Sequence, residues 1–188
     1  MSLKIYTNCI YLQAQKTQLK WNMKVKIVRL SDNVRVNGII EDKRKHALPS
    51  FHDGWFFYFN KHSKKANALT YVLVTEETPL FIEGCLILKE EKEIGYYMAY
   101  IEIAPHNQGS NKKYDNVAGC LIAFACRLSH IKSNGFLSFH VSEKDQKNQI
   151  KLMSHYSKKY RAIKVMDTKE MIITPEDGQI LIKKYLDG

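Results

Sequence analysis

The apolar residues of the segment 116–132 recur with the period of an α-helix. They stand at successive steps of four, three, four and three residues, at Val117, Leu121, Phe124, Leu128 and Ile131. This spacing places all of them on one helical face. We therefore expect a helix from about Asn116 to Lys132, ended by the pair Asn134-Gly135, because glycine readily adopts the left-handed conformation that closes a helix.

The residues before this helix have the pattern of strands. Three segments rich in β-branched and aromatic residues, connected by short turns, predict an antiparallel meander; they are residues 69–76, 80–90 and 94–104. Two shorter strands are expected at 24–30 and 35–40, within a first forty residues whose pattern is weaker. Residues 40–65 are expected to contain helix that is interrupted near Pro49.

After the long helix the pattern alternates between strands and helices. We expect a strand over 135–141, a helix over 146–160, strands over 162–167 and 169–174, and a last helix from Pro175. This order predicts an α/β (α+β) fold, with a mixed, mostly antiparallel central sheet and helices on both faces. The sheet would contain one βαβ crossover, formed by the end of the meander, the long helix and the next strand.

Length and composition fit one domain over residues 1–188. With 45% hydrophobic and 26% charged residues, the chain is typical of a globular protein. No apolar run reaches the roughly 20 residues that span a bilayer, and the N-terminus lacks the pattern of a signal peptide, so we expect a cytoplasmic protein with no membrane partner. The four cysteines and seven histidines show no metal-site spacing, so neither a metal nor a disulfide framework is predicted.

Positive charge is concentrated in one third of the chain. The net charge is +10, and residues 105–165 hold eleven basic residues against three acidic ones. A field of this sign attracts polyanions, which include nucleic acids and phosphorylated cofactors.

The long helix is expected to begin on small side chains. The sequence NVAG at 116–119 leaves the first backbone N–H groups almost unshielded, and these donors, with the positive end of the helix dipole, suit phosphate oxygens. Lys112 and Lys113 add positive charge just upstream. The alternative is that the small residues only let the helix pack closely against the sheet.

Two segments of this region resemble motifs of the GNAT superfamily, the Gcn-related N-acetyltransferases. Residues 113–118, KYDNVA, resemble the acyl-CoA loop Q/R-x-x-G-x-G/A of that family, and residues 155–162, HYSKKYRA, resemble its downstream FYxKxGF. The resemblance extends over roughly Tyr71 to Val165, with the two motifs in the family's order and separated by one helix and one strand.

Several residues depart from the family pattern. Lys113 stands for the Gln or Arg, Asn116 for the first Gly, and Arg161 for the Gly of the second motif. Asparagine tolerates left-handed backbone better than other non-glycine residues, so we expect the loop to form. The connection 105–115 is also longer than is usual in the family.

The resemblance implies an acyl-CoA-dependent N-acyltransferase. It would transfer acetyl from acetyl-CoA to a primary amine by direct attack in a ternary complex, with acetyl-CoA or coenzyme A as the cofactor. The cofactor-binding residues that the resemblance implies are Ile103, Ala104, Lys112, Lys113, Tyr114, Asn116, Val117, Ala118 and Gly119.

The resemblance also implies catalytic residues. Tyr156 matches the family tyrosine that protonates the leaving thiolate, with ordinary packing as the alternative. Glu102 points to the opposite sheet face from Ile103, which suits either a general base or a carboxylate paired with a lysine. Most of the aromatic rings in 55–59 are expected in the core, with one or two at the acceptor pocket. Three histidines are expected to be ordinary surface or core residues, with a proton relay as the alternative for any that faces the cleft: His106, His140 and His155.

Two other interpretations stay open. The region from Lys112 to Lys164 could belong to a basic nucleic-acid-binding module, with tyrosines 114, 156 and 160 for base stacking, although it carries no known nucleic-acid-binding signature. The missing glycines are compatible with a GNAT-like protein that binds CoA without turnover. The acceptor is expected to be a small-molecule or peptide amine, or an amine carried by a nucleic acid; its identity, the acyl chain length and a homodimeric state are left open.

Overall fold

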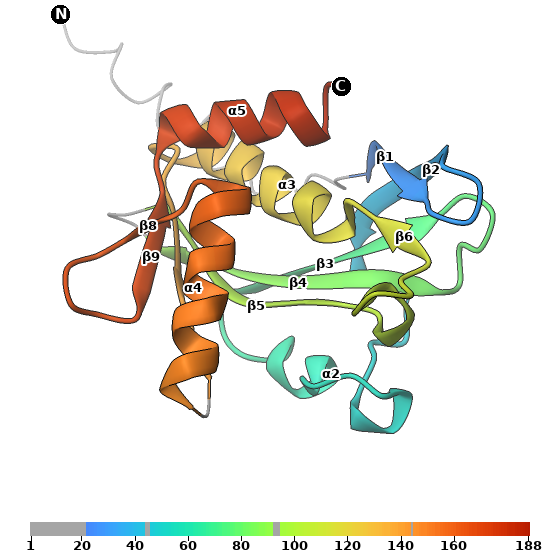
Figure 1. Ribbon diagram of the computed structural model, residues 1–188, viewed down its shortest axis with the longest axis horizontal. Helices are drawn as coiled ribbons and strands as arrows, with labels where there is room; N and C mark the ends of the chain where they lie inside the picture. Colours follow the sequence, from blue (N-terminus) through green and yellow to red (C-terminus); the bar gives the residue numbers. More distant parts are fainter. Residues whose placement is uncertain (1–21, 44–45, 92–94, 144) are drawn as a thin grey trace, which may run out of the picture.

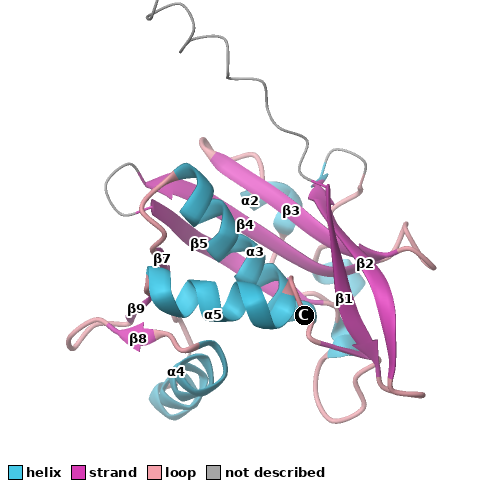
Figure 2. Ribbon diagram, turned by 90° about the horizontal axis from the view of Figure 1, so that it is seen from above, coloured by secondary structure: helices cyan, strands magenta, loops and turns pink. Residues whose placement is uncertain are grey.

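The computed structural model describes residues 22–43, 46–91, 95–143 and 145–188. In these ranges one sheet has the strand order β6-β1-β2-β3-β4-β5-β7-β9-β8 (Figures 1 and 2). The strands are β1 (Asn22–Arg29), β2 (Val34–Asp42), β3 (Ala68–Thr75), β4 (Ile82–Glu91), β5 (Gly95–Ile103), β6 (Tyr114–Asp115), β7 (Leu137–His140), β8 (Ile163–Lys164) and β9 (Glu170–Ile173). The helices are η2 (Phe51–Asp53), α2 (Phe59–His62), η3 (Pro105–Asn107), α3 (Val117–Lys132), α4 (Gln146–Tyr160) and α5 (Pro175–Tyr185).

The sheet is antiparallel except between β5 and β7, which run parallel. Since α3 connects these two strands, the expected mixed sheet and its βαβ crossover are confirmed. The parallel pairing is short, because it joins only Tyr96 with Leu137 and Tyr97 with Ser138. Beyond Tyr97 the two strands diverge.

A β-bulge in β5 accounts for this divergence. On the β4 side, Met98 pairs with Leu88 and Tyr100 pairs with Ile87, so Ala99 is an extra residue in β5. An extra residue bends a strand and increases its local twist. Ala99 lies two residues after Tyr97, the last residue that pairs with β7, so the bend carries the rest of β5 away from that neighbour.

Helices cover both faces of the sheet, as expected. Figure 1 shows α3 and α5 together on one face and α2 on the opposite face. The larger core lies under α3, where Leu121 and Phe124 are fully buried against strand residues such as Leu86. On the other face a smaller cluster is built around Trp55 and Phe59.

The main differences from the sequence prediction lie in short elements. Of the helix expected within 40–65, the described residues form only η2 and α2. Gly54 takes a left-handed φ of 78°, and the buried Trp55 fixes irregular backbone on the sheet. Only Ile163–Lys164 of the strand expected over 162–167 forms, and the two-residue strand β6 was not expected. Expectations for residues 1–21 lie outside the described residues.

A close helix–helix contact determines the residue at position 119. Gly119 is buried in the first turn of α3, and the ring of Tyr185 from α5 occupies the space that a side chain there would need. At this position a small residue is required for packing, which is the alternative given above for the small residues of 116–119.

Gly119→Ala should destabilise the protein by roughly 1–3 kcal/mol, because the added methyl group would overlap the Tyr185 ring. This overpacking outweighs the higher helix propensity of alanine, which normally stabilises a helix by ~1 kcal/mol relative to glycine. The free energy of unfolding, measured by denaturant titration, checks the effect. In a Tyr185→Ala background the same substitution should be neutral or stabilising, and an equal loss in both backgrounds would contradict the explanation.

Candidate active site

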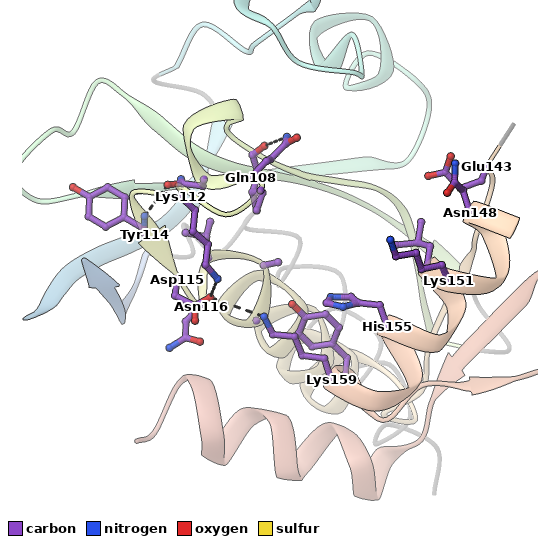
Figure 3. Close-up of a pocket in the computed structure, with 18 residues that line it drawn as sticks. Gln108, Lys112, Tyr114, Asp115, Asn116, Glu143, Asn148, Lys151, His155 and Lys159 are labelled. Atoms are coloured by element: carbon purple, nitrogen blue, oxygen red, sulfur yellow. Dashed lines mark hydrogen bonds and ion pairs between the residues drawn. The ribbon is translucent and has the colours of Figure 1, made fainter. Parts of the chain in front are cut away.

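A cavity of about 620 Å³ lies between the end of β5, the loop that leads to β6, the first turn of α3 and one face of α4 (Figure 3). Seven of the nine residues expected to bind a cofactor line it: Ile103, Lys112, Tyr114, Asn116, Val117, Ala118 and Gly119. The structure thus brings together segments that the sequence analysis assigned to one site.

The backbone edge of β5 faces this cavity. The Ala104 N–H donates to the Glu83 carbonyl of β4 at 2.9 Å. Because hydrogen-bonded and non-hydrogen-bonded pairs alternate in an antiparallel ladder, the backbone groups of Ile103 and Ile101 point away from β4, toward the side that β7 has left. The Ile103 carbonyl there accepts a hydrogen bond from Gln108 Nε2 at 2.8 Å.

Two of the expected cofactor residues lie outside the cavity lining. Ala104 is buried, and its carbonyl accepts the Asn107 N–H at 2.8 Å, so its backbone groups are used inside the fold. Lys113 is exposed, with its ammonium 5.0 Å from the centroid of the Tyr114 ring. Neither residue is placed where it would touch a ligand in the cavity.

The first turn of α3 presents backbone donors to the cavity. Asn116 caps the helix in the left-handed conformation, with φ 69° and ψ 0°, which its place in the motif led us to expect. Its side chain makes no capping hydrogen bond, and the first N–H to bond back to Asn116 is that of Cys120. The N–H groups of residues 117–119 therefore precede the helical hydrogen-bond ladder. A left-handed residue followed by helical ones forms a concave set of donors that suits an anion.

Lysines bring positive charge to the same cavity. Lys112 comes from the loop, and Lys151 and Lys159 come from α4 (Figure 3). Asp115 partly neutralises two of these lysines, since its Oδ1 lies 2.8 Å from Lys112 Nζ and 3.9 Å from Lys159 Nζ.

The charge state of Asp115 follows from these contacts. Partial burial acts to raise its pKa, but the hydrogen bonds from Lys112 and the Asn116 N–H and the charges of Lys112 and Lys159 outweigh burial and hold the pKa below its usual range. Asp115 is thus a carboxylate at neutral pH. The stabilisation from its contacts is present above the ordinary pKa and is lost as the pH falls through the lowered one.

A buried carboxylate supports the loop between β5 and β6. Glu83 of β4 is 1% exposed, and its Oε2 accepts from Asn107 Nδ2 at 2.8 Å and lies 2.6 Å from His106 Nε2. Asn107 Oδ1 in turn accepts the Tyr114 N–H at 3.0 Å. Neither Glu83 nor Asn107 was predicted to have a role, and His106 was expected to be an ordinary histidine, because the contact joins segments that no local pattern connects.

One face of α4 forms the opposite wall of the cavity. Its polar lining residues follow one another at helical steps of three, four and four: Asn148, Lys151, His155 and Lys159. Burial and the Lys159 charge lower the pKa of His155, so its imidazole is neutral at pH 7. These residues were not predicted as site residues, although the period was visible in the sequence.

Tyr156 lies next to this face, outside the cavity lining. Its ring centroid is 4.8 Å from that of Phe139 in β7 and 5.9 Å from that of Tyr160, which does line the cavity. Burial raises the pKa of Tyr156 to about 12, so its hydroxyl is protonated at physiological pH. Its role as a proton donor stays a prediction. At the motif's glycine position, Arg161 takes a left-handed φ of 58° that ends α4, so the turn forms although the glycine is absent.

Glu102 fixes a loop on the opposite face of the sheet. Its carboxylate oxygens accept the backbone N–H groups of Phe56 at 2.7 Å and Phe57 at 3.0 Å. From the sequence, Glu102 was expected to be a general base or the partner of a lysine, and neither of these contacts was predicted. A second cavity of about 740 Å³ adjoins Glu102 on this face and shares Gln108 with the first.

The described ranges contain no group of three or more His, Cys, Asp or Glu side chains arranged to hold a metal ion. Three cysteines are free and buried: Cys85, Cys120 and Cys126. Over the same ranges, each helix is too short or too polar to cross a bilayer.

Comparison with known proteins identifies the fold. No protein-family model matches the chain, and no curated protein matches its sequence. Among solved structures, AtaTR bound with acetyl-CoA aligns with a TM-score of 0.50 and 12% identity, over 84% of this chain and 98% of that one. A mutant of KacT aligns with a TM-score of 0.50 and 10% identity, over 85% of this chain and 99% of that one. Both are GNAT acetyltransferases, and the present chain has the GNAT fold.

Asp115→Asn should strengthen the binding of inorganic pyrophosphate by about 2- to 5-fold, because Lys112 and Lys159 lose the carboxylate that competes for them. Isothermal titration calorimetry at low salt measures the dissociation constant, and the gain should shrink as ionic strength rises. The matched control is Asp167→Asn, which removes a carboxylate 3.9 Å from Lys164, outside the cavity, and should change nothing. An unchanged affinity in Asp115→Asn would show that the two lysines do not contact the anion.

Proposed function

We propose that the protein is an acyl-CoA-dependent N-acyltransferase that transfers acetyl from acetyl-CoA to a primary amine. The observation that carries this proposal is the left-handed Asn116 at the start of α3. The N–H groups of residues 117–119, which precede the helical hydrogen-bond ladder, belong to the lining of a cavity that three lysines also line. The GNAT fold supports it, as does the fact that AtaTR, whose fold is similar, was solved with acetyl-CoA.

The residues of the cavity fit the two parts of coenzyme A. Residues 117–119 and Lys112 would hold the diphosphate, because backbone donors at a helix start and a nearby ammonium both favour phosphate oxygens. The amide-containing arm would pair with the free backbone edge of β5 at Ile101 and Ile103, as an added strand does at a sheet edge. The side chain of Gln108 donates a hydrogen bond to the Ile103 carbonyl, so it would have to move aside when this arm binds.

Acetyl-CoA supplies a thioester as the acyl donor. During transfer the amine nitrogen forms a bond to the acyl carbon, the C–S bond breaks, the amine loses one proton and the departing thiolate gains one. The protein contributes chiefly by holding the two reactants together in the orientation that the reaction needs. Well-oriented reactants react as if one of them were present at an effective concentration of about 10⁵ M or more.

Two residues have proposed parts in this reaction. Tyr156 is the proposed proton donor to the thiolate, since its hydroxyl is protonated and its ring packs on β7 at the divergence of the sheet. We assign Glu102 the positioning of the loop at Phe56 and Phe57, because both of its oxygens already accept backbone hydrogen bonds. A general-base role for Glu102 would require it to release that loop.

Ala118→Glu should weaken CoA binding at least 10-fold and leave the melting temperature of the free protein unchanged or slightly higher. The new carboxylate lies at the positive end of the α3 dipole, where it adds about 0.3–1 kcal/mol to stability, but it repels the diphosphate. Calorimetric titration and thermal unfolding measure the two effects. In the wild-type protein, CoA at 100 times its dissociation constant should add about 2.7 kcal/mol of stability.

The control is Ala118→Gln, which adds nearly the same bulk without the charge and should retain most of the affinity. Equal losses in the two variants would indicate a steric effect only. Full affinity in Ala118→Glu would rule out a diphosphate at this helix start. Stabilisation by duplex RNA that exceeds that by CoA and persists at a few hundred millimolar salt would favour the nucleic-acid-binding alternative.

Tyr156→Phe should lower turnover by about 10²-fold while the CoA dissociation constant stays the same, because only the proton donor is lost. Release of free thiol from acetyl-CoA, with a screened amine as the acceptor, measures the rate. Tyr160→Phe tests the neighbouring hydroxyl, which belongs to the cavity lining. A wild-type rate for Tyr156→Phe would make Tyr156 a packing residue.

A further inference from the structure

Three cavities meet around the diverging ends of β5 and β7. The CoA-side cavity shares Gln108 with the cavity of about 740 Å³ and shares Glu143 with a third cavity of about 490 Å³. The second and third cavities share Phe56 and Phe57. A ligand on the α2 face could therefore approach the gap in the sheet while the CoA-side cavity is occupied from the α3 and α4 side.

Phe56 presents an aromatic ring to solvent from an anchored backbone. The residue is 66% exposed, but its backbone N–H is held by Glu102 at 2.7 Å. Its ring meets Phe57 edge to face, with centroids 5.1 Å apart, and Phe57 meets Tyr100 at the same separation. An exposed ring whose supports are already ordered loses little conformational entropy when an apolar ligand packs against it.

The third cavity has a carboxylate at the boundary with the CoA-side cavity. Glu143 is exposed and belongs to both linings (Figure 3). His140, another lining residue, is paired through Nδ1 with Glu170 at 2.9 Å. A ligand ammonium would be attracted to Glu143, close to the gap at which β5 and β7 separate.

We propose that the acceptor is a primary amine joined by a short alkyl chain to an aromatic ring or an apolar group of similar size. The apolar group packs against Phe56 on the α2 face, and the amine lies beside Glu143 at the boundary with the CoA-side cavity. This inference rests on the proposed function and adds the class of its second substrate.

A linear polyamine fits these cavities less well. Each of its cationic nitrogens needs an acidic or carbonyl partner, whereas the carboxylates lining the second and third cavities are Glu102, which is held by two backbone N–H groups, and Glu143. Lys89 lines the third cavity and repels additional positive charge. A small polar amine would leave the aromatic surface uncovered.

The test compares the binding of 2-phenylethylamine, ethanolamine and spermidine to the full chain by calorimetric titration, with and without CoA. We expect 2-phenylethylamine to bind at least 10-fold more tightly than either comparator. Phe56→Ala should weaken its binding about 10-fold or more, because the ring contact is lost. The matched control is Phe81→Ala: Phe81 is 67% exposed, nearly the same as Phe56, but lines none of the three cavities, so binding should not change.

Glu143→Gln tests the charged end of the ligand separately. It should weaken the binding of 2-phenylethylamine several-fold and leave that of 2-phenylethanol unchanged, because the alcohol has the same ring and chain but no positive charge. An equal loss for both compounds would show that Glu143 acts through the shape of the cavity, and would overturn its assignment as the ammonium partner.

The inference and the proposed function fail in different ways. Tighter binding of ethanolamine or spermidine than of 2-phenylethylamine, or full affinity in Phe56→Ala, overturns the aromatic acceptor even when CoA binds normally. Absence of CoA binding overturns the proposed function, while the amine titrations without CoA still report on the aromatic site. When both ligands bind, the order of kcat/KM for the three amines should follow the order of their affinities.

Discussion

The extra residue at Ala99 is the constraint on which the candidate site depends. Pairing with β4 continues on both sides of the bulge, so β5 stays in the sheet while its other edge leaves β7 after Tyr97. This one-sided separation exposes the backbone groups of Ile101 and Ile103 without breaking the core beneath α3. A regular β5 would pair with β7 along the length of β7, and the cavities on the two faces would be separated by an intact sheet.

The sequence predicted those features that depend on local pattern. The helical period of α3 needs no distant partner to be recognised, and the left-handed backbone at Asn116 could be expected from the residue type. The bulge at Ala99 could not, because residues 94–104 are almost continuously apolar and an inserted residue breaks no visible alternation. The segment was thus predicted correctly as a strand, but the bulge that lets its edge line the site was not predicted.

Site residues were hardest to predict where a distant segment decides their orientation. Lys112 and Lys113 are equivalent in the sequence, and the pairing of Tyr114 and Asp115 with β1 fixes which of them faces the cavity. Gly119 resembled part of an anion loop, whereas its lack of a side chain is required by a ring from the last helix. Tertiary packing decides both cases. Residue type alone therefore could not predict which lysine faces the cavity or why position 119 is a glycine.

The pairing of strand β6 with β1 determines when the candidate site can form during folding. Its residues Tyr114 and Asp115 pair with Arg29 and Val28 at the edge of the sheet, and Asn116 follows immediately at the head of α3. The two paired segments are far apart in the sequence, and the entropy lost on closing so long a loop must be offset before the pairing is stable. The hairpins β1–β2, β3–β4 and β4–β5 join neighbouring segments and can form first. The helix start at Asn116 acquires its final position only when β6 docks on β1. A fragment that lacks the N-terminal hairpin would therefore retain the sequence of the anion loop without the surface that fixes its conformation.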